Sequence, residues 1–336
     1  MSRIQVYCLV ALLAIFIISC DQDNGQLSGF SSPENDSVLI AHIKEPLLTL
    51  VDLETNDIQK EIELPFIISD MVYIEHLDTF VIAGQDQSDL QYFNHETDSF
   101  DSLVSLEEGI NHLYYIPETM ELYASNSLYN TLYRILYCDD GTENIQVEVI
   151  ETGEHPGSIT YSPDLDRLFL SNVYDHRIEV YDRQNLQQLD AFHVLDRPNG
   201  LLLVDDRLFI GGHGTGGDLN RAVHIVSIDN NEEQKQIETG LMPVFFEHDS
   251  ENDNVLVLNH GSHTISLIDL NNFQVTQDQE VSFNPYYSIQ YQDDYLITTL
   301  DGHELVRLDK NTLSIKHSIP VQPGPHSMII LEGTNP

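Results

Sequence analysis

Seven short apolar strands recur along this chain at nearly constant spacing. They begin at Val38, Phe80, Leu122, Leu168, Leu208, Val255 and Leu296, so successive starts lie 42, 42, 46, 40, 47 and 41 residues apart. A period of this length with several strands per repeat is typical of a β-propeller. The sequence therefore predicts an all-β, seven-bladed β-propeller of four-stranded antiparallel blades. Unrelated functions share this architecture, so the repeat alone does not identify one.

The repeat from Pro156 to Val194 shows the plan of one blade most clearly. Four runs of β-branched, aromatic or alternating apolar residues are separated by turn residues, as in the cluster at 162–166. The third strand ends in an Asp or Asn that can close the turn through its side chain, at Asp52, Asn94, Asp182, Asp229, Asp269 and Asp309. No stretch keeps a 3.6-residue apolar period, so we expect almost no helix in the mature protein.

The order of these patterns resembles the YVTN-type seven-bladed propeller repeat. Residues 122–126 and 168–172 stand where that repeat has its Tyr-Val-Thr-Asn, and the resemblance covers about residues 36–333. It is weak around Phe80, and the longer turn at 137–141 departs from the pattern. The resemblance implies a bacterial or archaeal propeller outside the cytoplasm, but it does not imply one activity.

The ends of the repeat region complement each other. The chain closes on a lone first strand, 326–331, whereas its first repeat begins directly with a second strand at Val38. We expect the last strand to complete the first blade, which removes an exposed sheet edge. Residues 36–333 are then one domain, a single closed ring.

The first nineteen residues predict a signal peptide rather than part of the fold. An apolar run of 13 residues from Val6 to Ile18 follows Arg3, a length that suits a signal-peptide core better than a membrane span. It ends in Ile17-Ile18-Ser19-Cys20, which resembles a bacterial lipobox and implies lipidation of Cys20. The alternatives are an ordinary signal peptide or an uncleaved anchor. Residues 20–35 are polar and predict a flexible tether. The prediction is a lipoprotein anchored to the cell membrane outside the cytoplasm.

The formal charge of −41 is extreme. It argues against nucleic acid as a partner, because binding phosphates requires clustered Lys and Arg. An acidic surface with few lysines suits a salty exterior, which we interpret as a halophilic or marine habit. Calcium binding is the alternative, but no complete Ca²⁺ loop is present. After lipidation of Cys20 the mature chain would keep Cys138 as its one other thiol, which we interpret as a bystander.

Histidines gather at one end of the predicted channel. The beginnings of first strands and the turns between second and third strands share this end, because strand direction alternates within a blade. Nine of the fifteen histidines map there: His42, His112, His155, His176, His213, His260, His263, His303 and His326. The candidate ligand-binding residues are His155, Arg197, Asn199, His213, His260, Tyr286 and His326, with Tyr287 beside them.

Converging imidazoles can bind Zn²⁺, Cu²⁺ or iron, and His155, His213, His260 and His326 are the candidate metal ligands. The favoured interpretation is simpler: histidines serve as polar turn residues that bond to backbone carbonyls. The glycine-rich stretch 211–217 predicts a flexible turn, because it leads into a strand and lacks the Lys of a phosphate-binding loop.

Two classes of function remain open. One is a lipid-anchored binding module that takes a protein or a small molecule at the channel mouth. The other is a metal-dependent propeller enzyme of the lactonase or oxidoreductase type. The sequence identifies no cofactor and no catalytic residue.

Overall fold

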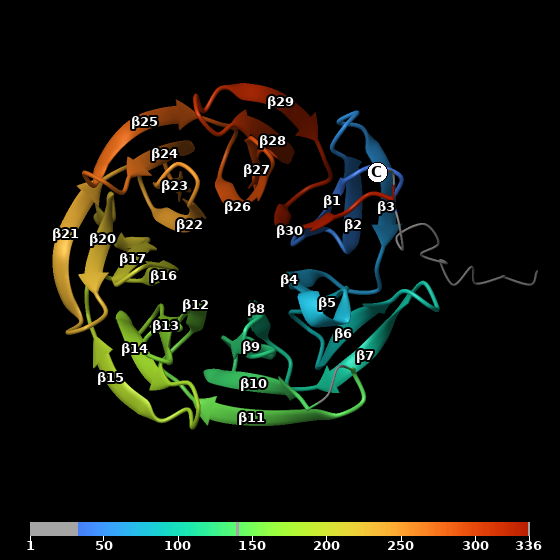
Figure 1. Cartoon of the computed structure of the whole chain (residues 1–336), viewed down its shortest axis with the longest axis horizontal. Helices are drawn as coiled ribbons and strands as arrows, with labels where there is room; N and C mark the ends of the chain where they lie inside the picture. Colours follow the sequence, from blue (N-terminus) through green and yellow to red (C-terminus); the bar gives the residue numbers. More distant parts are fainter. Residues whose placement is uncertain (1–32, 139–140, 335–336) are drawn as a thin grey trace, which may run out of the picture.

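The computed structural model of the chain describes residues 33–138 and 141–334. In this part, seven four-stranded antiparallel sheets stand as blades around a central channel, as the sequence predicts (Figure 1). The expected signal peptide at 1–19, Cys20 and most of the tether at 20–35 lie outside the described residues. Among the described residues no helix is long and apolar enough to cross a membrane.

The blades follow one another along the chain, and each runs from an innermost first strand to an outermost fourth strand. Blade 1 contains β30 (Pro325–Leu331), β1 (Ser37–His42), β2 (Leu47–Asp52) and β3 (Ile58–Glu63). Blade 2 contains β4 (Ile68–Ile74), β5 (Thr79–Gly84), β6 (Asp89–Asn94) and β7 (Ser99–Ser105), with a 3-10 turn η1 (Glu75–Leu77). Blade 3 contains β8 (Ile110–Ile116), β9 (Glu121–Asn126), β10 (Thr131–Tyr137) and β11 (Ile145–Glu151). Blade 4 contains β12 (Pro156–Ser162), β13 (Arg167–Asn172), β14 (Arg177–Asp182) and β15 (Gln188–Phe192).

The last three blades repeat this order. Blade 5 contains β16 (Pro198–Val204), β17 (Arg207–Gly212), β20 (Ala222–Ser227) and β21 (Glu232–Glu238). Blade 6 contains β22 (Pro243–Asp249), β23 (Asn254–Asn259), β24 (Thr264–Asp269) and β25 (Gln274–Glu280). Blade 7 contains β26 (Pro285–Tyr291), β27 (Asp294–Thr299), β28 (Glu304–Asp309) and β29 (Ile315–Pro320). The glycine-rich stretch predicted as a turn leads into a small hairpin, β18 (Gly214–Thr215) with β19 (Asp218–Leu219).

The two ends of the chain close the ring in blade 1. Strand β30 pairs antiparallel with β1, from Ser37 opposite Leu331 to His42 opposite Pro325. The C-terminal strand thereby becomes the innermost strand of the blade that the N-terminal strands begin. This confirms the predicted closure: β1 now has a partner strand on both sides, and β30, as the innermost strand, faces the channel.

The hydrophobic core lies between neighbouring blades rather than inside any one of them. The described residues form seven apolar clusters, each of which joins two adjacent blades around the ring. Second strands are the centre of these clusters, and β5 and β9 are buried along their whole length. Fourth strands such as β21 are largely exposed. No blade can therefore bury its two faces alone, and the ring stabilises all of them together.

Every first strand carries a β-bulge close to its beginning. The register shifts in all seven pairings of first with second strands, for example between Pro285 and Tyr287 in blade 7 and between Ile110 and His112 in blade 3. At a bulge, two residues of one strand lie opposite one residue of the partner strand. The bulge thereby changes the direction of side chains that strict alternation would place on opposite faces of the sheet. Consecutive residues of one strand can therefore both face the channel.

A repeated hydrogen bond joins each of several turns to the next blade at the end of the channel where first strands begin, which we call the mouth end. His263, in the turn between β23 and β24, accepts at Nδ1 from the backbone N–H of Asn284, 3.1 Å away. His176 and His303 accept in the same way from Arg197 and Gly324, and Asn130 does so through its amide oxygen. All four acceptors adopt positive φ. We call this contact the inter-blade latch.

The latch makes a prediction for stability. His263→Ala should lower the free energy of unfolding by about 1 kcal/mol, because it removes the acceptor of the Asn284 N–H. His263→Asn should lower it less, since asparagine tolerates positive φ and serves as the acceptor at Asn130. Urea denaturation measures both, with His317→Ala on exposed strand β29 as the control. Equal losses for Ala and Asn would contradict a role of the hydrogen bond.

Candidate functional site

A cavity of about 540 Å³ occupies the channel, and all seven first strands contribute to its lining. Consecutive residues line it together, as with Asn111 and His112, Gly157 and Ser158, and Tyr286 and Tyr287. These pairs lie at the bulges, but consecutive residues beyond the bulges, such as Leu113 and Tyr114, line the cavity as well. Both members of a pair reach the channel because the first strand is the innermost strand of its blade. The volume falls within the range of small-molecule sites.

One wall of the cavity is built around the carboxylate of Asp70 in β4. Its Oδ2 lies 3.0 Å from Nδ1 of His112 and accepts from the N–H of Leu113 at 2.8 Å, while Oδ1 accepts from the N–H of Met71 at 2.8 Å. Burial raises the pKa of Asp70, but the hydrogen bond and charge of His112 outweigh it and hold the pKa below its ordinary value. An ionised carboxylate only accepts, so Nδ1 of His112 is the donor.

Amide and hydroxyl groups extend this polar wall. Asn111 donates its amide N–H to the carbonyl oxygen of Pro156 at 3.0 Å, whereas its Oδ1 is buried without a hydrogen-bond partner. Ser158 donates its hydroxyl proton to the carbonyl oxygen of Asn199. Asn199 also lines the cavity, as expected from the sequence. Asn111 Oδ1 is therefore free to accept a hydrogen bond from a polar ligand.

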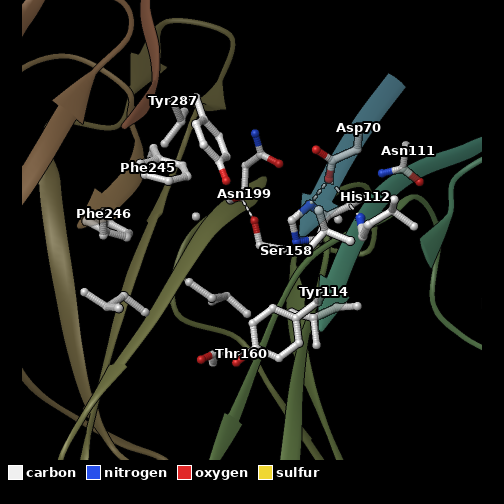
Figure 2. A pocket seen from close by; sticks show the side chains of 18 of the residues that line it. Asp70, Asn111, His112, Tyr114, Ser158, Thr160, Asn199, Phe245, Phe246 and Tyr287 are labelled. Atoms are coloured by element: carbon white, nitrogen blue, oxygen red, sulfur yellow. Dashed lines mark hydrogen bonds and ion pairs between the residues drawn. The ribbon is translucent and has the colours of Figure 1, made fainter. Parts of the chain in front are cut away.

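Aromatic side chains form the facing wall (Figure 2). Phe245 in β22 and Tyr287 in β26 contact each other, with ring centroids 4.7 Å apart, and Phe246 and Tyr286 also line the cavity. Burial, followed by the nearby charge of Asp70, raises the pKa of both Tyr286 and Tyr287, so both stay protonated. The cavity thus has one apolar aromatic side and one side of hydrogen-bonding groups.

Four of the predicted site residues form a continuous row of ring contacts at the mouth end. The ring centroids of His213 and His260 lie 5.9 Å apart, those of His260 and Tyr286 also 5.9 Å, and those of Tyr286 and His326 4.6 Å. His326 is only 9 % exposed and its Nδ1 has no hydrogen-bond partner. Burial lowers the pKa of His326 and, with the added charge of Arg197, that of His213. Both imidazoles are therefore neutral near pH 7.

His155 and Arg197 form a separate group at the mouth end. Both residues adopt positive φ directly before a first strand. Their side chains meet on Tyr174: the His155 ring centroid lies 4.6 Å from that of Tyr174, and Arg197 Cζ lies 5.8 Å from it. Neither side chain lines the cavity. Burial lowers the pKa of His155.

Other histidines of this end have structural partners. His176, His263 and His303 form the inter-blade latches, and His42 is buried with Nε2 2.9 Å from the hydroxyl of Thr49. The simpler interpretation of turn histidines fits the three latch residues, with one difference. They accept from backbone N–H groups instead of bonding to carbonyls.

The geometry offers limited support for a metal centre. Within residues 33–138 and 141–334, no group of three or more His, Cys, Asp or Glu side chains lies close enough together to hold a metal ion. Of the four candidate ligands, His213 and His260 contact each other, whereas the ring of Tyr286 lies between His260 and His326. Metal binding at these residues stays a prediction resting on one histidine pair.

Several residues that line the cavity were not expected from the sequence. Chief among them are Asp70, Asn111, Ser158 and Phe245, while His112 was assigned to the mouth end without a role. One signal was available for Asp70, since it is the one charged residue in the first strand Ile68–Ile74. Its pairing with His112 crosses from blade 2 to blade 3 and has no counterpart in the repeat pattern.

Comparison with known proteins identifies the fold. No family model and no curated protein matches the sequence. Among solved structures, dihydro-heme d1 dehydrogenase NirN in complex with DHE is 11% identical at a TM-score of 0.66, over 90% of this chain and 76% of that one. A functionally unknown protein from Desulfotomaculum acetoxidans is 11% identical at a TM-score of 0.70, over 88% and 99% of the two chains. Apo AztD from Citrobacter koseri is 11% identical at 0.61, over 88% and 98%. At this identity the likeness is one of fold alone.

The row of rings predicts an unusual titration for His260. Burial, reinforced by neighbouring His213, lowers the pKa of His260 to about 4. The unfolded chain binds its proton near pH 6.5, so between about 6.5 and 4 the unfolded state carries more protons and stability falls as the pH falls. Long-range ¹H–¹⁵N NMR should place the midpoint near pH 4, and His213→Ala should raise it. A midpoint above 6 would contradict the burial of this imidazole.

Proposed function

We propose that this protein is a binding module that takes a small molecule into its central channel at the mouth end. One observation supports this most directly: the seven first strands place an aromatic wall and a hydrogen-bonding wall around one cavity of about 540 Å³. Small-molecule sites combine apolar surface with a few fixed polar groups in this way. NirN, which shares the fold, is described in complex with DHE.

The polar wall is organised before any ligand arrives. Asp70 is fixed by two backbone N–H groups and in turn orients His112, so the free Nε2 of His112 is held in one direction. Groups that need no rearrangement on binding cost less conformational entropy, which favours affinity. Rigid first strands, rather than mobile loops, supply these residues.

The enzymatic alternative has no comparable support. A metal-dependent reaction would rest on the His213–His260 pair, which supplies two ligands. Catalytic zinc sites commonly use three protein ligands.

We further propose that the protein is a lipid-anchored member of the YVTN-type repeat family outside the cytoplasm. The lipobox-like residues 17–20 and the repeat pattern support this. Strand β1 is a second strand, so it runs toward the mouth end, and residues 33–36, which precede it, lie at the opposite end.

Binding in the channel is testable by thermal shift with a library of small metabolites. A ligand at about 100 times its Kd adds about 2.7 kcal/mol of stability, which in a domain of this size should raise the Tm by roughly 5 °C. The double variant Asn199→Ala with Tyr287→Ala should lose these shifts while remaining folded. Tyr129→Ala and His317→Ala, on exposed side chains, are the matched controls.

Two results would contradict the channel as the site. One is a set of hits whose shifts are unchanged in the double variant, which would place binding elsewhere. The other is the absence of any hit with the wild-type protein.

Anchoring is tested by fractionation of a bacterial host. The wild-type protein should partition with membranes, and Cys20→Ala should appear in the soluble fraction or stay unprocessed. A correctly cleaved Cys20→Ala protein that remains membrane-associated to the same extent would contradict lipid attachment.

A further inference from the structure

The sign of the charge in the cavity limits what can bind there. Among its lining residues, Asp70 supplies the one carboxylate, and none is Lys or Arg. The pKa of Asp70 lies below its ordinary value, so the group is negative at neutral pH. The formal charge of −41 adds to the negative potential around the cavity. An anionic ligand would meet no fixed cation in the cavity, whereas a cation would meet a carboxylate.

The aromatic wall also favours a positively charged ligand. The faces of Phe, Tyr and Trp rings attract cations through their quadrupole, and the attraction is stronger away from water. Tyr286 and Tyr287 lie close enough to Asp70 for its charge to raise their pKa, and Phe245 packs on Tyr287. Aromatic rings and a carboxylate around one cavity recognise organic cations.

The polar wall presents several acceptor atoms beside the carboxylate of Asp70. His112 donates Nδ1–H to Asp70, which leaves its other ring nitrogen, Nε2, to face a ligand. Asn111 offers Oδ1, which has no hydrogen-bond partner, while one of its two amide N–H groups bonds to Pro156. The hydroxyl of Ser158 donates its hydrogen bond to the carbonyl oxygen of Asn199, so its oxygen lone pairs can still accept. Such a wall matches a ligand that donates N–H bonds.

We propose that the channel cavity binds an organic ammonium ion, with its nitrogen beside Asp70 and its apolar part against Phe245 and Tyr287. This proposal rests on the channel being the ligand site. It identifies the chemical class that the site prefers: a cationic N–H donor that carries an apolar group.

Three probes of matched size and different charge test the class at pH 7: 2-phenylethylammonium, 2-phenylethanol and phenylacetate. Titration followed by calorimetry or ligand-observed NMR should show the ammonium ion binding at least tenfold more tightly than the alcohol. Phenylacetate should bind more weakly than both. The comparison uses the full-length folded protein and needs no knowledge of the natural ligand.

Two variants test whether Asp70 causes the preference for the ammonium ion and whether Phe245 contacts the apolar part of the probes. Asp70→Asn should reduce the ammonium-to-alcohol affinity ratio to near one, because it removes the charge and keeps the shape. Phe245→Ala should weaken both probes together. Asp164→Asn in an exposed turn and Phe283→Ala, whose side chain is 64% exposed, are the matched controls. If Asp70→Asn does not fold, the three-probe comparison on the wild-type protein still decides the question.

The results separate this proposal from the function on which it rests. Equal or tighter binding of the alcohol or phenylacetate overturns the ammonium class, and so does the absence of binding by all three probes. In either case, library hits that are lost in the Asn199→Ala, Tyr287→Ala variant would still uphold the channel as a binding site.

Discussion

One pairing of strands, between β1 and β30, determines the shape of everything else in the molecule. It converts a row of blades into a ring, and only in a ring do all seven first strands face a common channel. The pairing also brings His326 beside Tyr286 and within the electrostatic range of Asp70, so that blades 7, 1 and 2 meet at the cavity. Because the apolar clusters lie between blades, closure and the hydrophobic core stabilise each other.

Most of the fold could be predicted from the sequence, because it depends on local and repeated features. Apolar strands at a regular period gave the blades, and turn residues such as Asp52 and Asp309 gave the ends of third strands. The carboxylates of both residues accept hydrogen bonds from N–H groups two and three residues further on, as that interpretation requires. Closure followed from the unmatched strands at the two ends.

The site could be predicted only in part, for a physical reason. Strict alternation assigns one of two neighbouring residues to the channel, whereas consecutive residues of the innermost strands line it, as with Tyr286 and Tyr287. The Asp70–His112 pair joins two blades across 42 residues of sequence, and no repeat pattern contains it. The presence of a histidine at the mouth end also does not show which role it has. His326 lines the cavity, whereas His263 forms an inter-blade latch.

We propose that the protein holds its ligand in the channel cavity, between the hydrogen-bonding wall and the aromatic wall. The most direct measurement is a crystal structure of the protein grown with the compound that stabilises it most. The account predicts ligand density in contact with both His112 and Tyr287 and enclosed by the first strands. Density confined to the outer strands, or a channel closed by side chains with the ligand elsewhere, would contradict it.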